Sequence, residues 1–203
     1  MFSSRYRLCD LFGIPIYIST SFIVLLVLFV LDFGSFSYGL SMALVLAISV
    51  TAHELAHALT ARAFGYRTTD ITLSLLGGCA SMISLPRKAS QEFLTALAGP
   101  LMSFALAGTA LILDFFGLHL GNRWLGFVLT YAGGFNLLPG FPMDGGRIFR
   151  SVMRLFLTRA RATLVAMWVG RGFAVLLGLR GLSTVFNGGS FGFITLLIAW
   201  MIW

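Results

Sequence analysis

Long apolar runs separated by short polar segments dominate the chain. A helix that spans a bilayer needs about 20 mostly apolar residues. The pattern predicts six such helices, at Ile14–Phe33, Ser41–Phe64, Glu92–Phe116, Trp124–Phe141, Thr163–Leu179 and Ser190–Trp203. The last run is short for a complete span. With 203 residues, the length suits one domain, so we expect an all-α polytopic membrane protein with a single domain over residues 1–203.

One segment between the second and third predicted helices has a different period. Thr72 and Ser74 alternate with Leu73 and Leu75, and Gly77-Gly78 then precedes a further stretch compatible with a strand. Period-two alternation around a glycine pair is typical of a β-hairpin. We therefore expect a membrane-associated hairpin at this point of an otherwise helical fold.

The third predicted helix carries small residues at four-residue spacing. They are Gly99, Ser103 and Ala107, and Pro100 lies among them. Small side chains on one face allow membrane helices to approach closely, and a proline kinks a helix. We expect this face to pack against a neighbouring helix.

The composition agrees with a membrane protein. The chain is 58% hydrophobic and only 10% charged, whereas soluble domains are nearer to half apolar and a quarter charged. The apolar runs are continuous, which excludes the short alternating segments of a membrane β-barrel. The two cysteines, Cys9 and Cys79, form no CxxC motif, so the sequence indicates neither a disulfide framework nor a thiolate metal site.

The net charge of +7 is explained by topology. Cytoplasmic loops of membrane proteins are rich in Lys and Arg. If the N-terminus is cytoplasmic, the predicted inner loops hold eleven of the 14 basic residues: Arg5, Arg7, Arg62, Arg67, Arg87, Lys88, Arg147, Arg150, Arg154, Arg159 and Arg161. This asymmetry favours a cytoplasmic N-terminus with six spans, and no nucleic-acid partner is needed to explain the charge. Arg171 falls inside the fifth predicted helix. The sequence leaves open whether its side chain snorkels to the membrane surface, forms an ion pair or faces a cavity.

The second predicted helix contains the sequence His53-Glu54-Leu55-Ala56-His57. Residues four apart share a helix face, so both histidines can reach one zinc ion, and Glu54 can act as general base on the attacking water. A structural histidine pair packed between helices is the alternative. Ionisable groups inside a membrane are costly and usually functional, which favours the metal site.

A catalytic zinc site usually has three protein ligands. His119 lies in a loop expected on the outer side, away from the inner end of the helix that carries the pair. Asp144 follows a helix interrupted by Pro139 and Pro142, with glycines around it, and this break is expected at the depth of the histidines. The sequence therefore favours Asp144 as the third ligand, while an ion pair with Arg147 is the alternative for that carboxylate. Asn136, in the same apolar helix, could bind substrate backbone or another helix.

These motifs resemble the site-2 protease family of intramembrane zinc metalloproteases. The resemblance rests on HELAH at 53–57 and NLLPGFPMDGG at 136–146, with support from GIPIYIS at 13–19, LGG at 76–78 and LAGP at 97–100. It spans nearly the whole chain, and Met143 stands where the family usually has Leu. The resemblance implies one Zn²⁺ per chain held by His53, His57 and Asp144, Glu54 as catalytic base, and Asn136 in substrate binding. It further implies the compact branch without a PDZ or CBS domain, in a bacterial or archaeal cell membrane.

The expected function is hydrolysis of peptide bonds in or near transmembrane segments of membrane proteins, with single-span proteins as substrates and the active site toward the cytoplasmic side. An unwound substrate needs new backbone partners, and a strand edge offers them. We expect this edge at Ile71, Thr72, Leu73, Ser74 and Leu75, or at the strand after Gly78. Three alternatives stay open: a zinc-binding membrane scaffold without hydrolysis, a transporter with a metal site, and another membrane protease with the HExxH motif.

Overall fold

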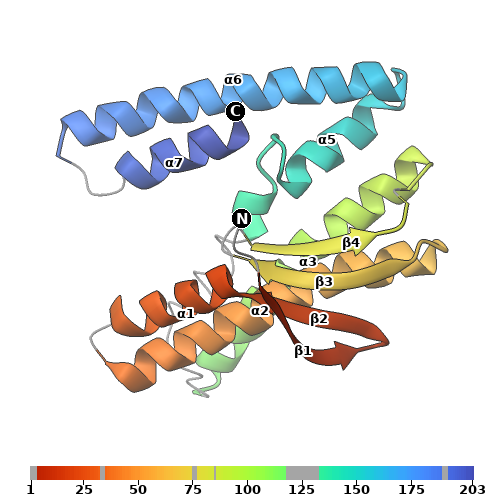
Figure 1. Ribbon diagram of the computed structural model, residues 1–203. Coiled ribbons are helices and arrows are strands. Elements are labelled where there is room, and N and C mark those ends of the chain that lie inside the picture. Colours follow the sequence, from red (N-terminus) through yellow and green to blue (C-terminus); the bar gives the residue numbers. More distant parts are fainter. Residues whose placement is uncertain (1–3, 33–34, 75–76, 85, 118–132, 189–191) are drawn as a thin grey trace. The chain divides into compact units, whose positions relative to one another are not determined.

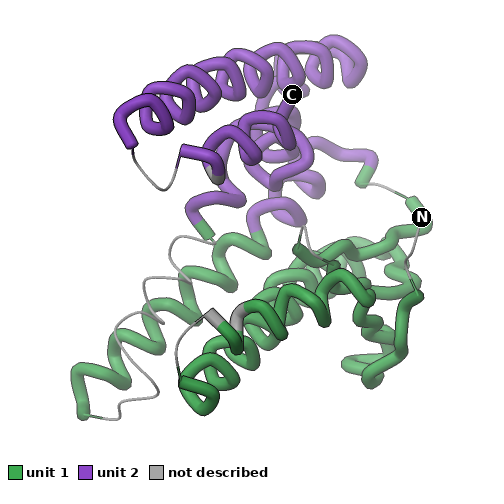
Figure 2. Tube along the Cα trace, turned by 60° about the vertical axis from the view of Figure 1, so that its left-hand side comes forward, with its two compact units in different colours: residues 1–86, 98–133 green, residues 87–97, 134–203 purple. Residues whose placement is uncertain are grey.

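The computed structural model describes residues 4–32, 35–74, 77–84, 86–117, 133–188 and 192–203 (Figure 1). The chain forms two compact units (Figure 2). Unit 1 comprises residues 1–86 and 98–133, and unit 2 comprises residues 87–97 and 134–203. Helix α3, Ala89–Phe115, contributes its first residues to unit 2 and the rest to unit 1.

Unit 1 contains a four-stranded sheet in the order β1-β2-β3-β4. The strands are β1 Arg5–Leu11, β2 Ile14–Ser19, β3 Thr68–Ser74 and β4 Gly77–Met82. Strands β1 and β2 are antiparallel, β2 and β3 are parallel, and β3 and β4 are antiparallel. The hairpin predicted between the second and third helices is therefore confirmed, but it is half of a larger sheet.

The first predicted span, Ile14–Phe33, is wrong at its beginning. Residues Ile14–Ser19 form β2, and helix α1 covers only Thr20–Asp32. Ile14, Ile16 and Ile18 are buried on one face of the strand, a period-two pattern that is present in the sequence within the longer apolar run. The turn before the strand has positive φ at both central residues, 53° at Phe12 and 77° at Gly13, which is the backbone of a two-residue hairpin.

The core of unit 1 joins this sheet to helix α2, Phe36–Ala63. It contains the three isoleucines of β2, Ile71 and Leu73 of β3, Phe22 of α1 and Ala58 of α2. Helix α2 packs against both β3 and β4. Ala58 directly follows His57, so this packing holds the segment with the two histidines against the sheet.

Three helices among the described residues are long and apolar enough to cross a membrane: α2, α3 and α6, Arg159–Phe186. Helices α1, with 13 residues, and α7, Gly192–Ile202, with 11, are shorter than a span. The predicted helix Trp124–Phe141 lies largely in 118–132, outside the described residues, and only 133–136 of it are seen as helix. The fold is a mostly helical membrane protein with a small sheet.

Unit 2 is built from α5, Asp144–Met153, with α6 and α7. Its core contains Met143, Ala174 of α6 and Ile202 of α7. Gly140 lies against Gly170 of α6, where a Cβ on Gly170 would come within 3.0 Å of Gly140 Cα. The turn that precedes α5 is thus packed directly on the long helix α6.

Candidate metal centre

The two histidines of α2 form a buried pair in unit 1. Their exposed fractions are 6% for His53 and 3% for His57, and their Nε2 atoms are 3.1 Å apart. Zinc binds histidine nitrogen at about 2.0–2.1 Å, so two nitrogens of one tetrahedral site lie about 3.3 Å apart. The pair therefore has the spacing needed to share one ion, as the sequence predicted.

Gly99 of α3 keeps the space beside both rings open. A Cβ on this residue would come within 2.6 Å of His53 Nε2 and closer still to His57 Nε2. These separations approach metal–nitrogen bond lengths, so a methyl group would fill much of the space where a shared ion would bind. We call this space beside the two histidine rings the cradle. It has room for a metal because residue 99 has no side chain.

Ser103, one turn further along α3, orients one of the rings. Its Oγ lies 2.9 Å from His53 Nδ1, and both side chains are buried. In a neutral ring that binds a metal through Nε2, the proton is on Nδ1, and this N–H donates a hydrogen bond to the Ser103 hydroxyl. Hydrogen bonds of this kind fix the orientation of metal-binding histidines.

The small residues of α3 were predicted to allow close helix packing, and this is confirmed for Ala107, which packs against Val45 of α2. Gly99 and Ser103 have an additional role that spacing did not reveal, since they contact the histidines. A glycine and a serine at packing positions give the same sequence pattern whether they face apolar side chains or a metal site.

Glu54 lies beside the sheet in unit 1. A Cβ on Gly78 of β4 would come within 2.8 Å of Glu54 Cδ and closer to Cγ. The carboxylate side chain is half-buried and in close contact with the backbone of this strand. Strand β4 and the predicted general base are therefore neighbours.

Asp144 belongs to unit 2, where it is the first residue of α5 and is 7% exposed. The predicted helix break is confirmed, because residues 133–136 are helical, turns follow, and α5 begins at Asp144. The amide end of a helix favours a negative charge, so a carboxylate suits this first position of α5. An oxygen of Asp144 lies 3.8 Å from Arg147 Nη1, so the weak ion pair considered from the sequence is also present.

The glycines after Asp144 serve close approach rather than unusual backbone angles. Neither Gly145 nor Gly146 has positive φ. A Cβ on Gly145 would collide with the carbonyl groups of Leu137 and Leu138, and one on Gly146 would lie 2.8 Å from the carbonyl oxygen of Gly140. The backbone of the preceding turn therefore packs directly on the first turn of α5.

The sequence-predicted substrate edge is wrong for β3. Ile71, Thr72 and Leu73 pair with β2 on one side and β4 on the other, so their backbone is not a free edge, and Ile71 and Leu73 are in the core. Ser74 ends this strand, and Leu75 lies outside the described residues. Strand β4, the alternative after Gly78, is an outer strand of the described sheet.

Two other predicted residues have separate outcomes. Asn136 is half-buried at the end of the short helical stretch in unit 2, and its role in substrate binding stays a prediction. His119 lies outside the residues that the structure describes.

Arg171, left open by the sequence, stacks on two tryptophans. Its guanidinium carbon lies 5.3 Å from the ring centre of Trp168 and 5.6 Å from that of Trp203. Cation–π contacts of this geometry offset part of the cost of an arginine in an apolar helix.

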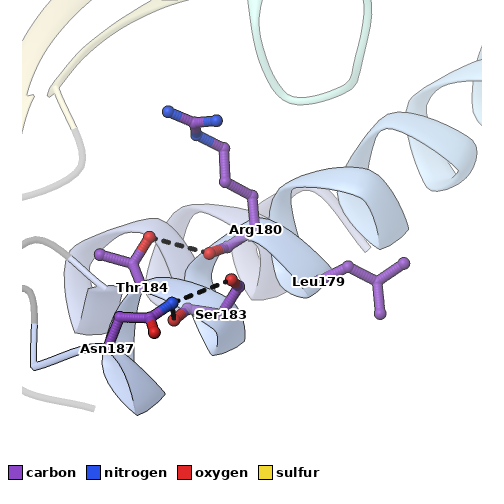
Figure 3. A pocket seen from close by; sticks show the side chains of 5 residues that line it. All are labelled: Leu179, Arg180, Ser183, Thr184 and Asn187. Atoms are coloured by element: carbon purple, nitrogen blue, oxygen red, sulfur yellow. Dashed lines mark hydrogen bonds between the residues drawn. The ribbon is translucent and has the colours of Figure 1, made fainter.

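A separate pocket lies along the last turns of α6 (Figure 3). There Thr184 Oγ1 donates to the carbonyl of Arg180 at 2.8 Å, and Asn187 Nδ2 donates to that of Ser183 at 2.8 Å. These polar groups bond within their own helix, and the pocket contains none of the predicted ligand residues.

Comparison with known proteins points to one family. The Peptidase family M50 profile matches residues 41–120. A putative zinc metalloprotease from Synechocystis is 34% identical over 223 residues, covering 98% of this chain and 58% of the relative. The putative zinc metalloprotease Rip3 of Mycobacterium tuberculosis is 37% identical over 174 residues, covering 81% of this chain and 44% of the relative. The chain thus spans about half the length of these curated relatives.

A solved structure agrees over nearly the whole length of both chains. The site-2 protease from Methanocaldococcus jannaschii has a TM-score of 0.72 and 30% sequence identity, covering 98% of this chain and 91% of the other. Agreement in both fold and sequence extends well beyond the histidine segment. The chain belongs to the site-2 protease family, Peptidase family M50.

Proposed function

We propose that this protein is an intramembrane zinc metalloprotease that hydrolyses peptide bonds in or near transmembrane segments of membrane proteins. The observation that carries the proposal is the buried pair His53 and His57, with Nε2 atoms 3.1 Å apart, on a helix of membrane-spanning length. Glu54 lies between them in sequence, and membership of the site-2 protease family supports the same reaction. We propose that the substrates of this protein are single-span membrane proteins, cleaved in regulated intramembrane proteolysis.

The proposed zinc ligands are His53, His57 and Asp144. All three are buried, and together they offer two imidazole nitrogens and one carboxylate oxygen. This donor set matches a catalytic zinc site with three protein ligands and one place left for water. We propose that residues 1–203 act as one protease domain. When bound, zinc acts as a Lewis acid that activates water and polarises the scissile carbonyl.

Glu54 is the proposed general base. It accepts a proton from the attacking water and then donates that proton to the nitrogen of the departing amine. The same carboxylate thus acts first as general base and then as general acid. The closeness of its side chain to β4 brings the base beside the strand proposed to bind substrate. Asn136 is a further candidate for holding substrate backbone.

Loss of Asp144 provides the test of the ligand set. We expect Asp144→Asn to lose zinc from the purified protein and to lose cleavage, because an amide is a weaker, neutral ligand. Zinc content is measured by elemental analysis, and cleavage by co-expression with candidate single-span proteins and mapping of the cut site. Asp114→Asn, on α3, is the matched control and should retain both. Normal zinc content in Asp144→Asn would contradict the assignment.

We also propose that an unwound substrate segment pairs with the outer side of β4. Peptides commonly bind by adding a strand to a sheet edge, and β4 is paired with β3 on its other side. A substrate strand there would recover backbone hydrogen bonds lost when its helix unwinds. Its backbone would lie next to Glu54, through the contact between this side chain and Gly78.

Proline substitutions in β4 test this docking mode. Successive residues of an antiparallel strand direct their N–H groups to opposite sides, so one of Cys79→Pro and Ala80→Pro removes an outward donor. We expect that variant to cleave at least about fivefold more slowly, with zinc content and thermal stability retained, because one docking hydrogen bond contributes about 1 kcal/mol or more in a desolvated site. Cys9→Pro, on the opposite outer strand β1, is the control. Equal cleavage by all three variants would rule out β4 as the docking edge.

The proposed arrangement in the membrane follows the basic residues. A cytoplasmic N-terminus and six spans place the histidine end of α2, with Arg62 in its last turn, toward the cytoplasm. The active site would then take water from that side. A bacterial or archaeal cell membrane is the proposed location.

A further inference from the structure

Glu92 is a buried acid that the reaction does not use. It lies near the start of α3 and is 1% exposed. One carboxylate oxygen accepts a hydrogen bond from Arg150 Nε at 2.7 Å and a second from Arg150 Nη2. The other oxygen accepts one from Arg154 Nη1. Both carboxylate oxygens are therefore engaged by two arginines, all within unit 2.

The two arginines lie at the far end of the helix that begins with Asp144. Arg150 is in the last turn of α5, and Arg154 is the residue directly after the end of this helix. Arg150 is six positions after Asp144, which is about 9 Å along a helix at 1.5 Å per residue. A helix this short moves as one rigid element, so anchoring its end also fixes the direction of its beginning.

Arg150 also reaches the turn that precedes Asp144. Its guanidinium carbon lies 5.1 Å from the ring centre of Phe141, and Arg154 Nη2 donates to the carbonyl of Arg87, just before α3. The close packing of Gly145 and Gly146 on the same turn holds the other end of α5. The carboxylate of Glu92 is therefore the centre of a contact network that joins α3, α5 and the turn before Asp144.

Removing only the charge of Glu92 would leave two largely buried arginines without their counter-charge. Their side chains are each 12% exposed. Breaking one partner out of a buried ion pair is far more disruptive than replacing the whole pair. The arginines would be expected to move toward water, and the end of α5 with them.

We infer that Glu92 is a positioning residue for Asp144: through Arg150 and Arg154 it holds α5 so that the Asp144 carboxylate is presented to the metal. This inference rests on the proposed role of Asp144 as a zinc ligand. Outer contacts that orient metal ligands typically change metal affinity by about 10–100-fold when they are removed.

The test compares Glu92→Gln with Asp144→Asn in the purified full chain loaded with Co²⁺, whose visible absorption reports its ligands. We expect Glu92→Gln to bind Co²⁺ and Zn²⁺ about 10–100-fold more weakly, by competition with a chromophoric chelator. Its Co²⁺ spectrum should shift toward that of Asp144→Asn. The double variant Glu92→Arg/Arg150→Glu places an acid between two arginines again and should recover affinity and spectrum in part. Asp70→Asn, which removes an acid paired with Arg5 in unit 1, should behave as wild type.

Thermal unfolding of the metal-free proteins separates positioning from stability alone. If Glu92→Gln unfolds at a lower temperature but keeps wild-type affinity and spectrum, Glu92 only stabilises the fold and the inference is overturned. Glu92→Asp, with a shorter acid, supplies the same comparison if Glu92→Gln does not fold. A wild-type spectrum and affinity in Asp144→Asn would overturn the ligand assignment itself, and this inference with it.

Discussion

Glu54→Gln is expected to bind zinc normally and to lose peptide hydrolysis. Glutamine has nearly the same size and shape as glutamate, so the packing against Gly78 should be kept. It cannot accept a proton from water at neutral pH. General base catalysis typically contributes about 10²–10⁴-fold to a rate. The cleavage rate should therefore fall by at least about 100-fold.

The measurement needs zinc content and cleavage in the same preparation. His53→Ala is the reference for loss of the metal and should lose both properties, whereas Glu54→Gln should lose only cleavage. Wild-type cleavage by Glu54→Gln would show that another group is the base. If instead the wild-type chain binds zinc and cleaves no candidate substrate, the scaffold function considered from the sequence gains support.

Gly99→Ala is expected to remove zinc and activity while the fold is kept. The added methyl group would come within 2.6 Å of His53 Nε2 and closer to His57 Nε2, occupying the space needed for a shared ion. Alanine favours a helix over glycine by about 1 kcal/mol. The two buried rings have to shift to admit a methyl group this close, which offsets this helical gain, so the metal-free variant is expected to fold without being more stable than wild type.

Gly108→Ala is the matched control for this prediction. It lies on the same helix, and a Cβ there meets no atom within 4 Å. It should gain a similar helical preference and keep zinc and cleavage. The two variants are compared by zinc content, cleavage and thermal unfolding. Zinc bound at the wild-type level by Gly99→Ala would mean that the ion does not lie in the cradle between the two rings.

The sequence alone identified the candidate residues for the proposed chemistry. HELAH places His53 and His57 on one face because an α-helix repeats every 3.6 residues, and this local geometry holds in any fold that keeps the helix. The prolines at 139 and 142 ended one helix and allowed another to begin at Asp144, because proline lacks the backbone donor that a helix requires. Long apolar runs likewise identified α2, α3 and α6 as helices long and apolar enough to cross a membrane.

The tertiary structure decided what these local elements meet. Residues 14–19 have enough apolar character to begin a spanning helix, and only pairing with β1 and β3 makes them a strand. The same pairing makes β3 internal and leaves β4 outside, which period-two alternation cannot distinguish because both strands have it. The sequence pattern indicated no role for Glu92 and marked Gly99 and Ser103 only as helix-packing residues, because their contacts are with groups between 42 and 62 residues away. Periodicity reports which residues share a face, whereas the partner of that face depends on long-range packing.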